Sequence, residues 1–399
     1  MSLAADLGLA VGDVLGPLTI GDIAHGGHCV ARHHGRVIFV RHAIPGEVVR
    51  ARLTQVAARF ARADATEILE PSPHRVSPRC SIAGRCGGCD FQHIDTAYQR
   101  ELKRRVVAEL LGHLATYEFT GQVEPAEPAD FGWRTRMRYH ITGDGRPGLR
   151  AHRSSEVIAL PEAGCAVARK EIDGHRDPTL GPPRDWAMLT PSTASAKGEI
   201  IAAVSASGAV CAARGALPPT LLEHAAGRDF RVVPDGFWQS HTRAPEILVS
   251  ALLEALQPNA GETAFDLFCG VGLFAAALAD AGCRVWGIEG DRSAVGLARV
   301  NVPEARFRAG DVGRNLHRLP RQADLVVLDP PRTGAGRGVM AAISAMRARS
   351  IAYVACDPAA LGRDLRVAQD AGLRVVSVRA FDLFPMTHHV ECLATLEPR

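Results

Sequence analysis

The 399-residue sequence predicts an α/β protein. From residue 236 onward, apolar strands alternate with helical stretches, which is typical of a doubly wound, mainly parallel sheet. The first 70 residues are short apolar stretches separated by glycine turns, which indicate a small OB-like β-barrel. The chain is also too long for one ordinary domain. We therefore expect three domains: the barrel at 1–70, an α+β region at 71–235 and the doubly wound domain at 236–399.

Composition is that of a globular protein and argues against a membrane or secreted protein. No run of about eighteen apolar residues is present, and Met1–Asp6 lacks the basic and apolar segments of a secretory signal. We therefore expect a cytoplasmic monomer with no membrane partner. The net charge is only +3, so overall charge alone does not predict nucleic-acid binding. The ten cysteines, in a large chain without a signal, favour metal binding or catalysis over disulfides.

Residues 11–70 carry the pattern of the predicted barrel. Turns at Gly26-Gly27 and Pro45-Gly46 separate apolar alternations such as 36–40 and 48–53. Such barrels often bind nucleic acid through one face. The charge for this would come from Arg32, Arg36, Arg41, Arg50, Arg52, Arg59 and Arg62. Solvated arginines on an ordinary small barrel explain the same pattern equally well.

A cysteine cluster follows the barrel. Cys80, Cys86 and Cys89 lie close together with two glycines, which lets the backbone wrap around a metal group. Cys165, in a turn further along the chain, is the best-placed fourth ligand. Four thiolates suit an iron–sulfur cluster, which we expect to be 4Fe-4S, and zinc would accept the same ligands. Packing without any metal is the remaining alternative.

The central region combines one helix with basic strands. Apolar periodicity predicts a helix over 96–114, with Lys103 on its basic face. In the strand 131–141, alternation places Arg134, Arg136 and Arg138 on one face, with Trp133 and Tyr139 flanking this run. This pattern fits RNA backbone contacts and base stacking, although a plain exposed strand face has the same pattern. Prolines in 176–184 predict a loop, and 200–204 with 209–213 predicts a hairpin.

The doubly wound domain begins with a helix predicted over 244–256. Seven strands are then expected at 262–268, 284–288, 306–311, 324–329, 351–356, 373–378 and 390–396. In such a sheet, ligands bind at the carboxyl ends of the strands.

Chemically active groups gather at these strand ends. A glycine turn with Gly270 and Gly272 follows the first strand, and Glu289 ends the second, where an acid accepts hydrogen bonds from ribose hydroxyls. Asp329 ends the fourth strand and Cys356 the fifth, just before a helix that starts at a proline. Glu391 begins the last strand. A thiol and carboxylates around a nucleoside cofactor form a catalytic arrangement.

Several motifs in order resemble the family of S-adenosylmethionine-dependent RNA uracil-C5 methyltransferases, which combine a TRAM domain, an iron–sulfur cluster and a class I methyltransferase domain. The resemblance covers essentially the whole chain. It is carried by the cysteines above and by Pro45-Gly46-Glu47, Phe237-Trp238-Gln239, Asp266-Leu267-Phe268-Cys269-Gly270-Val271-Gly272, Asp329-Pro330-Pro331-Arg332, Tyr353-Val354-Ala355-Cys356-Asp357-Pro358 and Phe381-Asp382-x-Phe384-Pro385.

The resemblance implies roles for individual residues. Cys356 would add to C6 of a uracil as the nucleophile, and Glu391 would remove the C5 proton. The residues implied to bind S-adenosylmethionine are Gln239, Phe268, Gly270, Glu289, Asp311 and Asp329. The implied partner is a structured RNA with a flipped-out uridine, and 23S rRNA is favoured over tRNA.

Two positions depart from the family pattern. Leu273 stands where an asparagine is frequent, and Asp357 follows the nucleophile where an asparagine is usual. A charge at Asp357 would oppose formation of the neighbouring thiolate. Two other functions stay open: an RNA-binding or RNA-folding factor that has lost catalysis, and an NAD-dependent oxidoreductase that uses Glu289 but leaves Cys356 idle.

Overall fold

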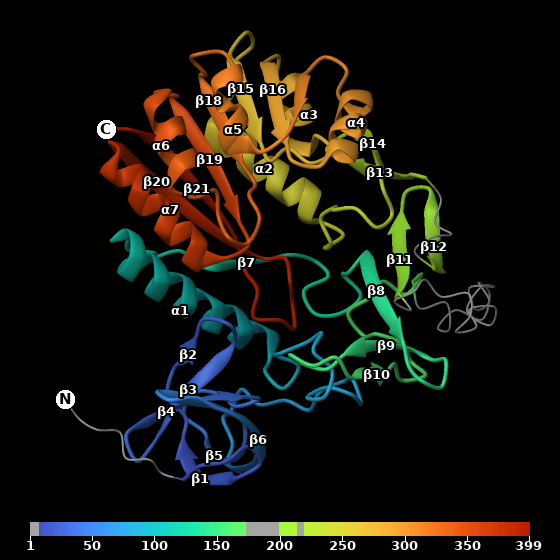
Figure 1. Cartoon of the computed structure of the whole chain (residues 1–399), viewed down its shortest axis with the longest axis vertical. Coiled ribbons are helices and arrows are strands. Elements are labelled where there is room, and N and C mark those ends of the chain that lie inside the picture. The colour runs from blue at the N-terminus through green and yellow to red at the C-terminus, as the bar shows by residue number, and fades with distance from the viewer. Residues whose placement is uncertain (1–7, 173–198, 214–218) are drawn as a thin grey trace.

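The computed structural model describes residues 8–172, 199–213 and 219–399, and it confirms a mixed α/β architecture. Figure 1 shows the β-rich N-terminal part at one end, the large sheet with its helices at the other, and helix α1 (Thr96–Ala115) between them. The predicted loop at 176–184 lies outside the described residues. In the described part of the chain, no helix is both long and apolar enough to cross a lipid bilayer.

The N-terminal part is a six-stranded sheet in the order β1-β5-β6-β4-β3-β2. Alternation along β5 buries Val49, Ala51 and Leu53, and register shifts in the β5–β6 ladder bend the sheet. The fully buried Glu47 accepts from the Ile44 amide and pairs with Arg75, which fixes the predicted turn. The strands are β1 (Val14–Thr19), β2 (Ile23–Ala24), β3 (His28–His33), β4 (Arg36–Arg41), β5 (Val48–Val56) and β6 (Phe60–Glu70).

The C-terminal part is an eight-stranded sheet in the order β17-β16-β15-β18-β19-β21-β20-β7. Its central strands β15, β18 and β19 are buried along their whole length because helices cover both faces. Strand β21 runs antiparallel between β19 and β20. The strands are β7 (Val123–Pro125), β15 (Thr263–Leu267), β16 (Arg284–Glu289), β17 (Arg306–Ala309), β18 (Leu325–Leu328), β19 (Ser350–Ala355), β20 (Leu373–Asp382) and β21 (Glu391–Pro398).

The helices of this part agree with the predicted alternation. They are α2 (Ala244–Leu256), α3 (Leu273–Asp280), α4 (Arg292–Asn301), α5 (Val312–Asn315), the 3-10 turn η2 (Leu316–Arg318), α6 (Arg337–Ala345) and α7 (Pro358–Asp370). Strand β7, which precedes the predicted last domain in the sequence, pairs in parallel with β20. The central segment therefore also contributes to the large sheet.

The central region has a five-stranded sheet in the order β10-β9-β8-β11-β12 and a separate hairpin, β13–β14. The predicted hairpin at 200–213 is confirmed by the β11–β12 pairing. The strands are β8 (Arg136–Ile141), β9 (Pro147–Arg150), β10 (Val157–Ala159), β11 (Glu199–Ser205), β12 (Gly208–Ala213), β13 (Leu221–Ala225) and β14 (Arg228–Val232).

The predicted stacking role of Trp133 and Tyr139 is wrong. Both side chains are fully buried in the core of the central region, so neither face is open to a base. The arginines between them also differ from one another: Arg136 pairs with Glu223, whereas Arg138 is exposed. Strand alternation identified the two faces correctly but not which of them is covered.

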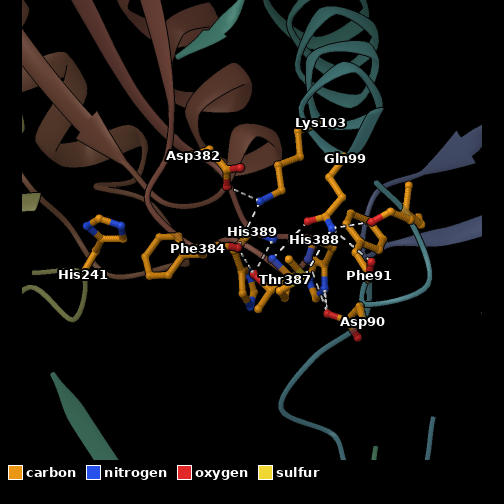
Figure 2. A network of polar contacts seen from close by, with 12 residues as sticks. Asp90, Phe91, Gln99, Lys103, His241, Asp382, Phe384, Thr387, His388 and His389 are labelled. Atoms are coloured by element: carbon orange, nitrogen blue, oxygen red, sulfur yellow. Dashed lines mark hydrogen bonds and ion pairs between the residues drawn. The ribbon is translucent and has the colours of Figure 1, made fainter. Parts of the chain in front are cut away.

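Helix α1 connects the N-terminal sheet, the cysteine segment (residues 80–91) and the large sheet. Lys103, expected on a solvated basic face, is instead buried, and its ammonium lies 2.6 Å from Asp382 and 3.0 Å from the Phe384 carbonyl oxygen. One turn earlier, Gln99 donates to the Phe91 carbonyl oxygen and accepts from the Met386 amide. Figure 2 shows these side chains converging on the loop between β20 and β21.

We expect Lys103→Met to lower the free energy of unfolding by about 3 to 5 kcal/mol, because it leaves the Asp382 carboxylate buried without its partner. Arg104→Met is the matched control, since Arg104 pairs with Glu101 at the protein surface, where a pair contributes about 0 to 1 kcal/mol. Urea unfolding measures both values. A loss at Lys103 no larger than the loss at Arg104 would contradict the role given to this buried pair.

Candidate active site

The thiol of Cys356 lies where β19 ends and α7 begins. Asp357 caps α7, because its side chain accepts a hydrogen bond from the Ala360 amide at 2.8 Å. Pro358 occupies the first turn of the helix, as the sequence predicts. The half-buried sulfur therefore lies at the carboxyl end of a central strand.

Glu391 reaches the same place from the opposite direction. It is the first residue of β21, and the register of this strand pairs Cys392 with Ala355 of β19. The next pair in that register brings Glu391 beside Cys356. The Glu391 carboxyl is almost completely buried, so the sheet holds a thiol and a carboxyl together away from bulk water.

Burial and neighbouring charge keep protons on both groups. Burial, followed by the Glu391 and Asp329 carboxyls, raises the pKa of Cys356 to about 12, and the Arg332 guanidinium opposes this. Burial and Asp329 likewise raise the pKa of Glu391 well above its ordinary value, again against Arg332. A bound cation or a change of solvation would therefore be needed to release a proton here.

The turn after β15 (residues 268–272) and the nearby Glu289 form a cradle that is open on one side. Phe268 has a φ of +64°, in the left-handed region, and Gly270 follows at +53°. A Cβ added to Gly270 would meet no atom within 4 Å, so the backbone is accessible there. Glu289, at the end of β16, accepts hydrogen bonds from the Gly270 amide at 3.0 Å and the Asp291 amide at 2.8 Å. These contacts orient the carboxylate beside the glycine turn.

Two further acids extend this cradle. Burial, with Glu289 nearby, raises the pKa of Asp329 to about 7. Asp266 is fully buried, and its pKa is raised to about 8, chiefly by burial; one of its oxygens accepts from the Ala275 amide and the other has no hydrogen-bond partner. A cationic or polar ligand placed among these carboxyls would offset their desolvation.

The structure brings four predicted site residues together: Glu391 acts electrostatically on Cys356, Asp329 acts on both of them, and Glu289 acts on Asp329. Asp311 is exposed and caps α5, while the amide of the preceding Gly310 donates to the Glu289 carbonyl oxygen. Gln239 is buried in the loop that leads into α2.

Sequence reasoning assigned no role to Arg332 or Asp266, although both lie in motifs that it singled out. Arg332 directly follows Asp329-Pro330-Pro331, so its place beside an acidic strand end was a usable signal. Its guanidinium lies 3.1 Å from the imidazole of His389 and borders the small cavity that contains Cys356.

The four cysteines of the predicted cluster line one cavity of about 400 Å³. The Cys86 sulfur accepts from the Gly88 amide, and burial raises the pKa of Cys89 to about 12. Among the described residues, no three His, Cys, Asp or Glu side chains are arranged to hold a metal ion. The convergence of the four thiols agrees with the prediction, whereas a bound metal is not shown.

The cysteine segment also supports the loop before Glu391. The amides of Asp90 and Phe91 donate to the Met386 carbonyl oxygen, and the Asp90 carboxylate lies 2.6 Å from the His388 imidazole. Figure 2 shows this contact at the tip of the β20–β21 loop. The cysteine segment is thus in direct contact with the loop that leads to the candidate base.

Three models of known protein families match parts of this chain. A TRAM domain model matches residues 12–66, a methyltransferase small domain model matches 245–333, and a model described as tRNA (Uracil-5-)-methyltransferase matches 313–399. An uncharacterized RNA methyltransferase of Streptomyces coelicolor is 45% identical over 95% of this chain and 92% of its own length.

Two further proteins are similar over nearly their full length. The 23S rRNA (uracil(1939)-C(5))-methyltransferase of Shewanella halifaxensis is 28% identical, with 95% of each chain covered. The solved structure of Pyrococcus abyssi tRNA (uracil-54, C5)-methyltransferase with S-adenosyl-L-homocysteine has a TM-score of 0.72 and 23% identity, covering 95% of this chain and 99% of that chain. This structural likeness shows a shared fold.

Proposed function

The chain belongs to the family of TRAM-domain RNA (uracil-C5) methyltransferases, and on that premise we propose that it methylates C5 of a uridine in 23S rRNA through a covalent bond between Cys356 and C6. The observation that carries this proposal is the pairing of β19 with β21, which sets Glu391 beside Cys356. A methyltransferase that only had to position an already nucleophilic atom would need no such thiol.

The chemistry follows from the weakness of uracil C5 as a nucleophile. The Cys356 thiolate adds to C6, and the electrons of the C5–C6 double bond move onto the C4 carbonyl oxygen as an enolate. The enolate returns electron density to C5, which takes the methyl group from the sulfonium of S-adenosylmethionine and leaves S-adenosylhomocysteine. Glu391 then accepts the C5 proton, the C5–C6 double bond re-forms, and the C6–sulfur bond breaks to restore the thiolate.

The protonated state of the free site fits this sequence of steps. The raised pKa of Cys356 and of Glu391 keeps both groups neutral before substrates enter. The positive charge of a sulfonium donor among the carboxyls lowers both pKa values, as Arg332 already does in part. Donor binding would therefore increase the fraction of Cys356 thiolate and ionise Glu391, with both protons released to water, so that the Glu391 carboxylate can later accept the C5 proton.

We assign the glycine turn and the surrounding acids to S-adenosylmethionine. Glu289 suits the ribose hydroxyls, because its carboxylate is already oriented by two backbone amides. Gly270 leaves open space beside it, and Phe268 borders the same turn. Asp329 would lie toward the methionine end of the donor and Asp311 toward the adenine, while Gln239 contacts the donor or the target base.

The choice of 23S rRNA rests on relatives that match over nearly their full length and are named as 23S rRNA (uracil(1939)-C(5))-methyltransferases. The likeness to a tRNA enzyme concerns the fold alone. The target uridine must leave its stack to reach a thiol this deep in the protein. We further propose a cytoplasmic monomer whose three functional units are residues 1–70, 71–235 and 236–399.

We also propose that Cys80, Cys86, Cys89 and Cys165 hold a 4Fe-4S cluster. Four thiols around one cavity suit a group that binds each sulfur through a different metal atom, and such a group needs wider spacing than one zinc ion does. The reaction transfers no electron, so the cluster would be structural. It would fix the segment whose Asp90 and Phe91 support the loop before Glu391.

We expect the wild-type protein to transfer the labelled methyl group of S-adenosylmethionine to a 23S rRNA transcript in preference to tRNA, with 5-methyluridine as the product. Cys356→Ala should abolish transfer, because C5 is no longer activated. Glu391→Gln should transfer methyl but stall before elimination, so that enzyme accumulates covalently on RNA. Cys283→Ala is the control, since this half-exposed thiol lies before β16. Full turnover by Cys356→Ala would overturn the proposed chemistry, and preference for tRNA would overturn the target.

For the cluster, anaerobically purified protein should contain about four iron atoms per chain and absorb in the visible range. Cys165→Ser should lose most of the iron and unfold at a lower temperature, whereas Cys283→Ser should retain both properties. Metal analysis, absorption and thermal unfolding measure these outcomes. Stoichiometric zinc without iron, or iron that survives loss of Cys165, would refute the assignment.

A further inference from the structure

The N-terminal sheet sends one turn into the catalytic cavity. The turn between β2 and β3 contains His25, Gly26 and Gly27, and the first two of these residues border the small cavity that contains Cys356. A Cβ added to Gly27 would come within 2.7 Å of the His388 Cβ, so this glycine is required by close packing against the β20–β21 loop. The β2–β3 turn therefore packs directly against the β20–β21 loop.

A specific polar contact completes this docking. The Nε2 of His25 lies 3.1 Å from one carboxylate oxygen of Asp357, while the other oxygen accepts from the Ala360 amide. Asp357 thus uses one oxygen to cap α7 and the other to hold the N-terminal sheet. The two residues are 332 positions apart in the chain.

The electrostatic consequence falls on Cys356. Asp357 is the residue next to the thiol, and its negative charge raises the pKa of Cys356. Although burial alone would raise the pKa of Asp357, the hydrogen bonds from His25 and the Ala360 amide lower it to about 2, so Asp357 is ionised at neutral pH. A cation beside this carboxylate offsets the repulsion that it exerts on a thiolate.

We propose that His25 is a positioning residue through which the TRAM domain completes the nucleophile's site: its imidazolium holds the cap of α7 in place and neutralises the carboxylate next to Cys356. This inference rests on the proposed function for its meaning in methyl transfer. The thiol chemistry on which it depends can be measured without RNA or S-adenosylmethionine.

The pH dependence has a definite sign. The hydrogen bond to Asp357 raises the pKa of His25 against the opposing effects of burial and Arg363. The contribution of the pair is therefore complete below the ordinary histidine pKa of about 6.5 and is lost as pH rises through the raised value. Around the thiol itself, Glu391 and Asp329 oppose ionisation together with Asp357, and Arg332 favours it.

The test is a double-mutant cycle on the alkylation rate of Cys356 by iodoacetamide, followed at the Cys356 peptide by mass spectrometry. We expect His25→Ala to slow alkylation at pH 6.5 about threefold to tenfold, since one unit of pKa changes the thiolate fraction tenfold. The factor should shrink toward one as pH rises to 9. In the Asp357→Asn background, His25→Ala should have almost no effect.

Two further variants sharpen the interpretation. His25→Gln keeps a side chain that can donate a hydrogen bond but lacks the charge, so it should slow alkylation as His25→Ala does. His224→Ala is the matched control, because His224 and Asp229 form a similar pair on the exposed β13–β14 hairpin, with the imidazole 2.9 Å from the carboxylate. It should leave alkylation of Cys356 unchanged.

An unchanged rate in His25→Ala would overturn the proposal. An equal effect of His25→Ala in both backgrounds would also overturn it, because that pattern reports altered access to the thiol and not a charge transmitted through Asp357. In methyl transfer, kcat should fall in His25→Ala with an unchanged KM for S-adenosylmethionine, and Asp357→Asn should restore it. If the wild-type protein transferred no methyl group, the proposed function would fail while the alkylation cycle would still decide the role of His25.

Discussion

The candidate site depends on one backbone arrangement, the insertion of β21 between β19 and β20 in antiparallel direction. In a purely parallel sheet, all strands would present their carboxyl ends at the site edge. The reversed strand presents its first residue there, so Glu391 meets Cys356 at the end of β19. Because both strands are buried, the hydrogen bonds between β19 and β21 fix the position of Glu391 relative to the end of β19. The placement of Glu391 beside Cys356 therefore does not depend on a mobile loop.

This arrangement concentrates acids at one edge of the sheet, and their burial has an electrostatic cost. Asp266, Asp329 and Glu391 all have raised pKa values, with burial as the largest cause. Such a site favours a cationic ligand and resists an anionic one, which suits a sulfonium methyl donor. Arg332, in the loop after β18, brings positive charge to the thiol side of the site, and the imidazolium proposed for His25 would add to it.

Local sequence patterns predicted the elements of the doubly wound domain well. The strand ending at Cys356 and the strand beginning at Glu391 were found within a residue or two, because apolar runs and proline mark their limits. Long-range partners were not predictable in this way. Lys103 has the helical position of a surface residue, and its burial is made tolerable by Asp382, 279 positions away, together with the Phe384 carbonyl oxygen. The prediction that Trp133 and Tyr139 stack on RNA bases was wrong for a related reason, since alternation does not reveal which strand face another layer will cover.

The central claim is that Cys356 attacks the pyrimidine ring, and RNA carrying 5-fluorouridine tests it most directly. Fluorine at C5 cannot leave as the proton does, so the methylated intermediate keeps its C6–sulfur bond. Incubation with S-adenosylmethionine should yield a stable protein–RNA adduct, and peptide mapping should locate the modified nucleotide on Cys356. No adduct with an RNA that the protein otherwise methylates, or an adduct that still forms in Cys356→Ala, would contradict the account.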